Sequence, residues 1–349
     1  MPEIFSAHRF AIGLFAQAAN PVEVVTPDLT VWHWLAFGLF VVVLLVLDLF
    51  IFHRDSREPT LRESAVWTLV WCAVAMAFNG LIWAWRGPEH AILFLTGYVV
   101  EWTLSMDNVF VFAVIFNYFA VPLKYQYRVL FWGIIGAIVM RLTFILLGAA
   151  LLAKFAWILP IFGLLLIYSG IKLAVHGDSD YNPEKDLTMR LAKRIFHVAK
   201  EDHKERFFVV ENGLRCITPL FLVLLVIDSA DLVFAIDSVP AIFGVTLDPF
   251  TIFTSNICAI LGLRALYFLL AGAMGMFRYL NYGLCAVLIF VGVKMVAEYW
   301  LLTPDDVAKG HHLVHPAVSL LVIASLLAIS ILASILIKHP APDQDEKSG

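Results

Sequence analysis

The sequence predicts an all-α, polytopic membrane protein of about nine transmembrane helices, and three observations support this fold class. Of the 349 residues, 61% are hydrophobic and 15% are charged, whereas soluble domains are about 45–50% apolar and about 25% charged. Apolar runs of roughly 18 or more residues, the length that a helix needs to cross a bilayer core of about 30 Å, follow one another along the chain. Short segments rich in proline, glycine and charge separate most of these runs.

The expected transmembrane helices occupy most of the chain. The apolar runs lie at residues 31–53, 64–85, 91–119, 126–151, 155–176, 216–243, 249–273, 279–300 and 315–338. We expect the first two, within residues 31–85, to lie at the periphery of the bundle. The run at 315–338 is expected to be its final helix.

Three segments lie outside the expected helices. Residues 177–214 are polar and form the sizeable extramembrane loop, in which alternating charges indicate a solvated amphipathic helix. Residues 1–30 resemble a weak secretory signal, but Glu3 and the low positive charge favour an N-terminal lead to the first helix. Residues 339–349 form a polar tail that we expect to be disordered.

Positive charge predicts the orientation in the membrane. If the N-terminus is outside, 16 of the 24 Lys and Arg residues lie in inward segments and 4 in outward segments. Cytoplasmic loops carry the excess of Lys and Arg. We therefore expect a bacterial-type inner membrane protein with its N-terminus outside, and with the loop at 177–214 and the C-terminus in the cytoplasm.

Two three-helix blocks, at residues 91–176 and 215–300, resemble each other. Three matches occur in the same order and at offsets of 122 to 124 residues. The matching segments are Ser105–Phe110 with Ser229–Phe234, Arg141–Ala149 with Arg264–Ala273, and Leu166–Lys172 with Leu288–Lys294. Because each block has an odd number of helices, the second enters the membrane from the opposite side. This predicts an inverted-topology repeat, as in many transporters, although a duplicated scaffold without transport gives the same pattern.

Acidic side chains occur in the middle of the third and sixth expected helices. A carboxylate at mid-bilayer costs roughly 2.5–3.5 kcal/mol, so it must be protonated, paired or bound to a cation. The candidate metal-binding residues are Glu101, Asp107, Asn108, Asp228, Asp231 and Asp237. The alternative is structural pairing, for which the available bases are Arg141, Lys172, Arg264 and Lys294.

Helical spacing places only some of these candidates together. Glu101, Ser105 and Asn108 occur at i, i+4 and i+7, which is one face of a helix. The two aspartates at 228 and 231 also share a face. The candidates at 107 and 237 lie off these faces, and a local break at Pro240 would help the latter to converge.

Other polar residues of the expected helices have weaker interpretations. Asp48 lies beside Arg54 and Arg57 at the end of the first helix and is interpreted as an interfacial anchor. Asn79 and Asn256 either reach a cavity at the midplane or bridge neighbouring helices, and the sequence does not decide between these roles.

The chemistry of the candidate residues favours a hard cation. Carboxylate, amide and hydroxyl oxygens without His or Cys suit magnesium, calcium or manganese(II), whereas zinc and copper(I) prefer nitrogen or sulfur. The four cysteines have no CxxC spacing, and no nucleotide-binding loop or HExxH occurs. We therefore expect no enzyme activity, no bound cofactor and no nucleic-acid partner.

Two long segments resemble a known family. Glu101–Asn108 and Asp228–Ala241 strongly resemble the two signature motifs of the TerC family, and Phe94–Tyr98 resembles the lead-in of its Alx-type branch. The resemblance covers roughly residues 31–300. It implies a small membrane exporter, with manganese(II) efflux as the expected activity.

The resemblance also implies roles for particular residues and a wider context. The residues expected to handle the ion are Glu101, Asp107, Asp228 and Asp231, with Asn108 and Asp237 as helpers. The family is linked to tellurium resistance, to alkaline pH response and to metal loading of exported proteins.

Two functions from different classes follow. The first is a secondary transporter that exports a hard divalent cation, most of all manganese(II), with protons as the coupling ion because carboxylates that bind metal also bind protons. The second is a non-transporting membrane component of a tellurium-resistance, redox or metalation complex. Its partners would be the lipid bilayer and other membrane or exported proteins.

Overall fold

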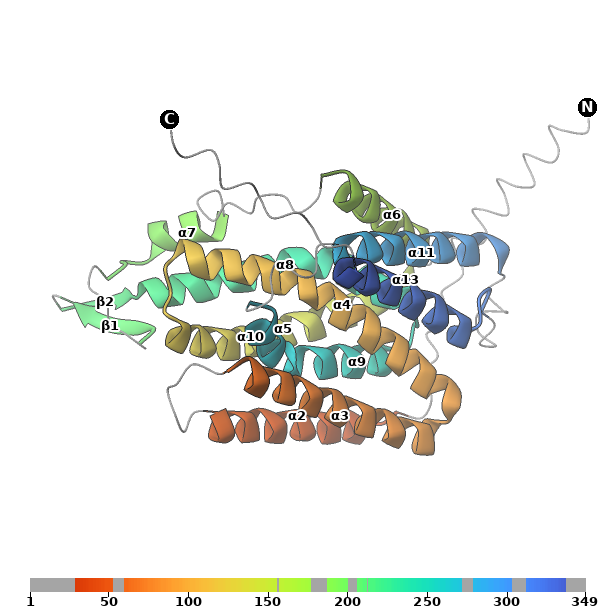
Figure 1. The fold of residues 1–349 in the computed structure, drawn as a ribbon, viewed down its shortest axis with the longest axis horizontal. Helices are drawn as coiled ribbons and strands as arrows, with labels where there is room; N and C mark the ends of the chain where they lie inside the picture. Colours follow the sequence, from red (N-terminus) through yellow and green to blue (C-terminus); the bar gives the residue numbers. More distant parts are fainter. Residues whose placement is uncertain are drawn as a thin grey trace, which may run out of the picture.

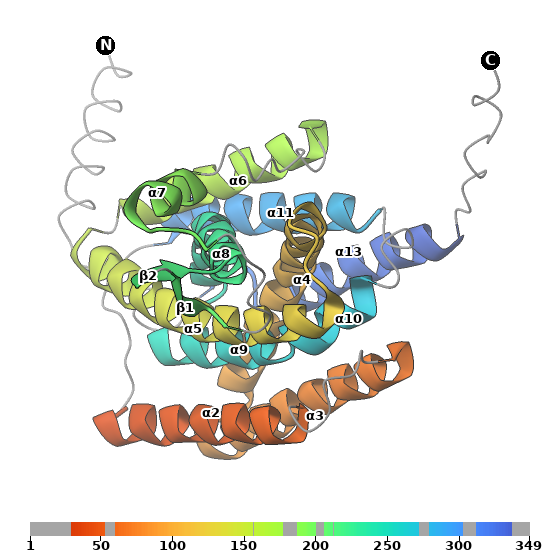
Figure 2. The ribbon, with the colours of Figure 1, turned by 90° about the vertical axis from the view of Figure 1, so that its left-hand side faces the viewer.

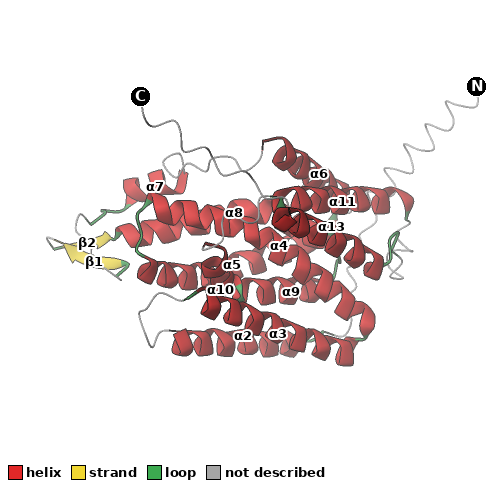
Figure 3. Ribbon diagram, in the orientation of Figure 1, coloured by secondary structure: helices red, strands yellow, loops and turns green. Residues whose placement is uncertain are grey.

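The computed structural model is a bundle of helices (Figure 1). Within the part of the chain that it describes, one pair of short strands is the only other regular structure (Figure 3). This confirms the all-α polytopic fold class. The described residues are 29–52, 60–155, 157–176, 187–199, 206–211, 213–271, 279–302 and 312–336. The N-terminal lead up to residue 28 and the polar tail at 339–349 lie outside them.

Eight helices among the described residues are long and apolar enough to cross a membrane. They are α2 (Val31–Phe52), α3 (Leu61–Arg86), α4 (Pro88–Tyr118), α5 (Leu123–Lys154), α6 (Ile158–His176), α8 (Pro219–Phe243), α11 (Leu280–Leu301) and α13 (Pro316–Leu336). A bent pair, α9 (Pro249–Leu261) and α10 (Leu263–Ala271), makes a ninth candidate. The predicted number of about nine is confirmed.

Local sequence signals fix where several of these helices begin. Thr60 and Glu63 form a capping box at the start of α3, in which each side chain accepts a hydrogen bond from the other residue's backbone N–H. The Thr218 side chain caps α8, and the Asp248 side chain caps α9. Proline follows both caps at the first helical position, where its missing N–H is not needed.

The predicted helix at 249–273 is divided in the structure. The axes of α9 and α10 differ by 43°, and Gly262 lies between them. A Cβ atom at Gly262 would lie 3.2 Å from Cβ of Trp71 on α3, so the glycine allows the break to approach α3 closely. The seventh span is therefore a broken helix.

The predicted loop at 177–214 contains more structure than expected. The short helix α7 (Leu187–Ile195) confirms a helix in part of this region. Strands β1 (Phe208–Glu211) and β2 (Leu214–Ile217) form an antiparallel hairpin that was not predicted, and its turn includes Gly213 at φ 79°. Both features lie at one end of the bundle, beside the start of α8 (Figure 1).

The helices are arranged around α4, which contacts α3, α8, α9, α10 and α13. On one side α5 packs against α8 and α9, and on another α6 packs against α11. Figure 2 shows α2 and α3 as a layer below the remaining helices. Residues from α4, α5, α8 and α9 therefore meet in the interior.

Helix α6 approaches α11 closely at glycines. A Cβ atom at Gly163 would lie 2.8 Å from the carbonyl oxygen of Gly292, and one at Gly292 would lie 2.5 Å from the carbonyl oxygen of Gly163. Small residues at helix interfaces are typical of membrane bundles. These two helices are the fifth and eighth spans, which correspond to each other in the predicted repeat. The contact of α4 with α9 likewise corresponds to the contact of α8 with α5. The inverted repeat stays a prediction with which these contacts agree.

Candidate functional site

The buried side chain of Arg141 on α5 joins polar residues from three other helices. Its Nη1 atom lies 2.5 Å from Oε2 of Glu101 on α4 and donates a hydrogen bond of 2.7 Å to Oδ1 of Asn256 on α9. Its Nη2 atom lies 3.8 Å from Oδ1 of Asp231 on α8. The exposed fractions are 1% for Arg141, 0% for Glu101 and 4% for Asp231. Oppositely charged groups thus meet where four membrane helices cross.

The α4 side of this cluster has the predicted helical face. Ser105 Oγ donates a hydrogen bond of 3.2 Å to Oε1 of Glu101, one turn earlier. One turn further on, Asn108 Nδ2 donates a long hydrogen bond of 3.5 Å to Oδ1 of Asp231. All three α4 residues are buried. The spacing of Glu101, Ser105 and Asn108 therefore predicted their common orientation correctly.

Asp228 extends the site along α8 by one turn. A Cβ atom at Gly136 on α5 would lie 3.0 Å from Asp228 Oδ1, so this carboxylate fits against a position without a side chain. Asp228 and Asp231 line a small cavity of about 10 Å³ together with Phe112, Gly133 and Arg264, among others. This volume is about what one water molecule needs. Among the described residues, the Oδ1 atom of Asp228 and the Oδ2 atom of Asp231 have no hydrogen-bond partner.

The structure places Asp237 at a different helix interface. Its Oδ1 atom accepts a hydrogen bond of 2.7 Å from Ser169 Oγ on α6, and Lys172 on the same helix attracts it electrostatically. The break expected at Pro240 is not found, since α8 continues through this residue to Phe243. The backbone of Asp107 lies in α4, but its side chain lies outside the described residues.

The other two intramembrane bases pair outside the signature motifs. Arg264 forms an ion pair with Asp48 of α2, and its guanidinium lies 4.1 Å from the centre of the Tyr127 ring. Lys294 Nζ lies 3.6 Å from Oε1 of Glu298 on α11. Asp48 is 6% exposed, and Arg54 and Arg57 lie outside the described residues, so its interpretation as an interfacial anchor stays a prediction. The basic residue that its burial requires comes from a distant part of the sequence, and only the packing of α2 reveals it.

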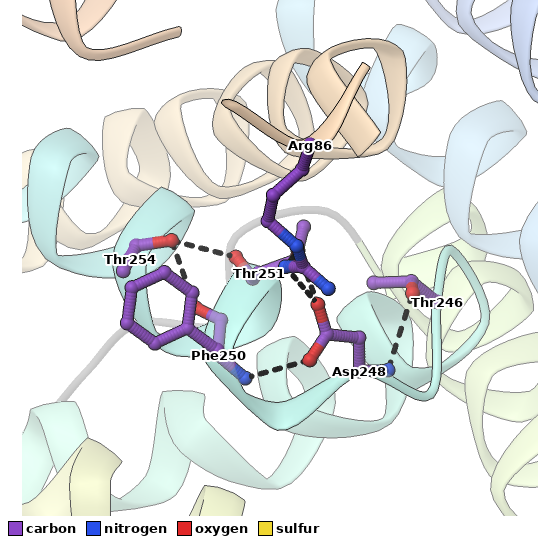
Figure 4. Close-up of polar contacts among 6 residues, drawn as sticks. All are labelled: Arg86, Thr246, Asp248, Phe250, Thr251 and Thr254. Carbon is purple, nitrogen blue, oxygen red and sulfur yellow. Dashed lines mark hydrogen bonds and ion pairs between the residues drawn. The ribbon is translucent and has the colours of Figure 1, made fainter. Parts of the chain in front are cut away.

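A second polar cluster lies where α3 ends and α9 begins (Figure 4). Arg86 Nη1 lies 2.6 Å from Oδ2 of Asp248, to which Thr251 Oγ1 also donates a hydrogen bond of 2.6 Å. The other carboxylate oxygen, Oδ1, accepts from the backbone N–H of Phe250 at 3.2 Å. Asp248 thus caps α9 and at the same time holds the last residue of α3. Sequence reasoning treated this segment as a loop, and its Asp-Pro pair was the available signal of a capped helix.

The metal-site prediction stays a prediction. Among the described residues, no three His, Cys, Asp or Glu side chains lie close enough together to hold a metal ion. Two candidate carboxylates, Glu101 and Asp231, are instead in contact with Arg141. The site is therefore charged and rich in oxygen atoms, and the side chain of Arg141 lies beside its carboxylates.

Long apolar helices around buried charges define the class of the chain as a polytopic integral membrane protein. The sequence profile described as "Integral membrane protein TerC family" matches residues 86–341. The chain belongs to this family, which confirms the resemblance found in the motifs.

Several curated relatives match most of the chain. A protein of Myxococcus xanthus named "Uncharacterized membrane protein STKORF319" is 45% identical over 312 residues, covering 89% of this chain and 94% of that protein. A protein of Escherichia coli (strain K12) named "Putative membrane-bound redox modulator Alx" is 42% identical over 287 residues, covering 79% and 89%. A protein with the same name from Photorhabdus laumondii is 39% identical over 311 residues, covering 86% and 94%. No solved structure matches the chain.

Proposed function

We propose that the chain is a secondary transporter that exports a hard divalent cation, manganese(II) above all, in exchange for protons. The observation that carries this proposal is the cluster of the buried Glu101 and Asp231 with the half-buried Asp228, in which one oxygen each of Asp228 and Asp231 has no hydrogen-bond partner among the described residues. Intramembrane ionisable residues of this kind typically mark an ion pathway. The role is transport, and the proposal includes no enzymatic step.

The donor atoms of the cluster favour the proposed substrate. The side chains offer carboxylate oxygens together with the Ser105 hydroxyl and the Asn108 amide. Hard cations such as manganese(II) prefer oxygen ligands. Asp107 and Asp237 belong to the same two helices, and we propose them as further ligands on the path of the ion.

The broken helix supports alternating access. Transporters with inverted repeats place their substrate site at discontinuous helices near the bilayer midplane. Here Asn256 on α9 contacts Arg141, and Arg264 just beyond the break at Gly262 lines the cavity beside Asp231. A change of angle at this break would therefore act directly on the walls of the site.

The test is manganese flux in proteoliposomes that contain the purified protein and a pH-sensitive dye. Wild-type protein should move manganese(II) and should move protons in the opposite direction. Asp231→Asn should lose at least about 90% of this flux, which corresponds to about 1.4 kcal/mol or more in the barrier, while expression and insertion remain normal. Asp231 lies 3.8 Å from Arg141, beyond hydrogen-bond distance, so its neutralisation leaves the closer pair with Glu101 in place.

Glu298→Gln is the matched control, because it neutralises a carboxylate that is paired with Lys294 outside the cluster. It should leave manganese flux close to that of wild type. Normal flux in Asp231→Asn would show that the cluster is not the ion site. Manganese flux that ignores pH gradients at fixed membrane potential would replace proton exchange with facilitated diffusion.

The second candidate function is a non-transporting component of a redox or stress-resistance complex. The names of the relatives from Escherichia coli and Photorhabdus laumondii favour it. The cysteines available for such a role are Cys72, Cys216, Cys258 and Cys285, none of which forms a disulfide bond among the described residues. Replacement of all four by serine should leave manganese flux unchanged if the chain is a transporter. The redox role would be favoured if wild-type protein shows no manganese flux and the cysteine-free variant fails to support stress resistance in cells.

A further inference from the structure

Arg141 lies next to two of the carboxylates that we propose as ion ligands. It lies against Glu101, which is completely buried, and within 3.8 Å of Asp231. Buried carboxylates at this depth need a positive charge nearby, because removing one partner of a buried pair leaves an uncompensated charge. Arg141 supplies such a charge from within the chain.

We propose that Arg141 is a tethered counter-ion, which neutralises the carboxylates of the empty site and gives way when the divalent cation binds. This inference rests on the proposed transport function and adds to it the way in which the empty site is stabilised. Unlike the transported ion, Arg141 is part of the chain and stays at the site throughout the transport cycle. It would therefore act mainly on the step in which the empty transporter changes orientation.

The contacts of Arg141 show how it can yield to an ion. The Asn256 amide gives its guanidinium a neutral acceptor at 2.7 Å, and that amide is itself held by a hydrogen bond from its Nδ2 atom to the carbonyl oxygen of Ile252. Within the described part of the chain the Nε atom of Arg141 has no hydrogen-bond partner, and its Nη2 atom lies as far as 3.8 Å from Oδ1 of Asp231. Asn256 can thus keep hold of the guanidinium while the carboxylates turn to a metal ion.

A tethered positive charge also explains why a divalent ion would be preferred. Of the described carboxylates Glu101, Asp228 and Asp231, Arg141 compensates one, and the nearby Arg264 is already paired with Asp48. The two that remain match the charge of one divalent cation. A single sodium or potassium ion could only replace the charge that Arg141 already provides, so it has little electrostatic advantage over the arginine.

Two transport modes separate this role from a purely structural one. Exchange of manganese for manganese uses only the loaded transporter, whereas net efflux also needs the empty transporter to return. Arg141→Gln should therefore keep exchange within about threefold of wild type and lose net efflux by tenfold or more. Equilibrium binding of radioactive manganese to the purified variant should be about tenfold tighter, because the internal competitor is gone.

Sodium competition gives an independent measurement on the same variant. A hundredfold excess of sodium should leave manganese binding to wild type unchanged and should weaken binding to Arg141→Gln, where the place of the guanidinium is vacant. Lys294→Gln is the control, since it removes a buried cation that pairs with Glu298 away from the cluster. Its ratio of net efflux to exchange should equal that of wild type.

The outcomes distinguish the two levels of the proposal. Absence of manganese exchange in wild type would overturn the transport function itself. Normal wild-type exchange, with exchange and net efflux reduced equally in a folded Arg141→Gln, would overturn only the tethered counter-ion. If Arg141→Gln does not fold, Arg141→Lys decides, because it keeps the charge and loses the planar fork. Retained net efflux in Arg141→Lys would support the counter-ion role of Arg141. Loss of both exchange and net efflux in this variant would overturn that role.

Discussion

At the scale of single residues, the two carboxylates that face Arg141 are not equivalent. Glu101 forms a direct ion pair at 2.5 Å, whereas Asp231 lies at 3.8 Å and also accepts from Asn108. Glu101 has no exposed surface, and its Oε1 atom is engaged by Ser105. Glu101 therefore holds Arg141 in position. Asp231 has an oxygen, Oδ2, that accepts no hydrogen bond from the described residues.

This difference predicts unequal effects on stability. Glu101→Gln should lower the free energy of unfolding by about 3 kcal/mol, since removal of one partner of a buried pair typically costs about 3–5 kcal/mol. Asp231→Asn should cost about 1 kcal/mol, the typical effect of a single substitution. Unfolding of the purified variants in mixed detergent measures both values. An equal loss, or a larger one for Asp231→Asn, would contradict the assignment of Glu101 as the main partner of Arg141.

Sequence reasoning found the polar faces of this site but not all of its contacts. The i, i+4, i+7 spacing of Glu101, Ser105 and Asn108 is a property of one helix, so it could be read directly. The contact of Arg141 with Asn256 joins residues 115 positions apart and depends on how α5 and α9 pack. Periodicity within a single helix contains no information about such a pair.

At the scale of the elements, the close approach of α6 and α11 depends on Gly163 and Gly292. A Cβ atom added at either glycine would lie within 3 Å of the carbonyl oxygen of the other. Neither position therefore accepts a larger side chain unless a helix moves. Gly170 is similarly close to the backbone of α11. The two helices therefore pack backbone to backbone along much of their length.

Gly292→Ala should destabilise the protein by about 1–3 kcal/mol, as overpacking in a well-packed interface typically does. Gly80→Ala on α3 is the matched control, because a Cβ atom there would meet nothing within 4 Å. In that helix the alanine should be neutral or stabilising by up to about 1 kcal/mol. Detergent unfolding curves of the two variants test this, and similar effects for both would disprove the close approach.

Boundaries of the elements were predictable where the chain carries apolar length and caps. Long helices such as α4 and α5 follow from their composition, whereas the hairpin at Phe208–Ile217 is too short to stand out from a polar loop. The effect of Pro240 was predicted wrongly. This proline lies in the last turn of α8, where one missing hydrogen bond does not interrupt the helix.

At the scale of the whole molecule, the orientation in the membrane is a prediction from the distribution of positive charge. Helix α7 and strand β1, which belong to the Lys- and Arg-rich segment at 177–214, lie at one end of the bundle (Figure 1). Such an excess favours the cytoplasmic side. The cluster of Arg86 and Asp248 would then lie at the outer end, where α3 stops and α9 starts.

Cysteine labelling tests this orientation in a variant without the native cysteines. A cysteine introduced by Thr188→Cys on α7 should react with a membrane-impermeant maleimide only after spheroplasts are opened. One introduced by Leu313→Cys, an exposed position between α11 and α13, should react in intact spheroplasts. The reverse pattern would establish the opposite topology and would turn the proposed export into uptake.

The ion pair between Asp48 and Arg264 has a consequence for biosynthesis. The ribosome adds 216 residues after Asp48 before it reaches Arg264, which takes about 10–40 s at typical rates of synthesis. During this interval α2 must reside in the membrane with its carboxylate protonated or turned toward the lipid headgroups, four residues from the end of the helix. Helix α2, the first of the described membrane helices to be made, therefore cannot complete its contact with Arg264 until α10 has been synthesised.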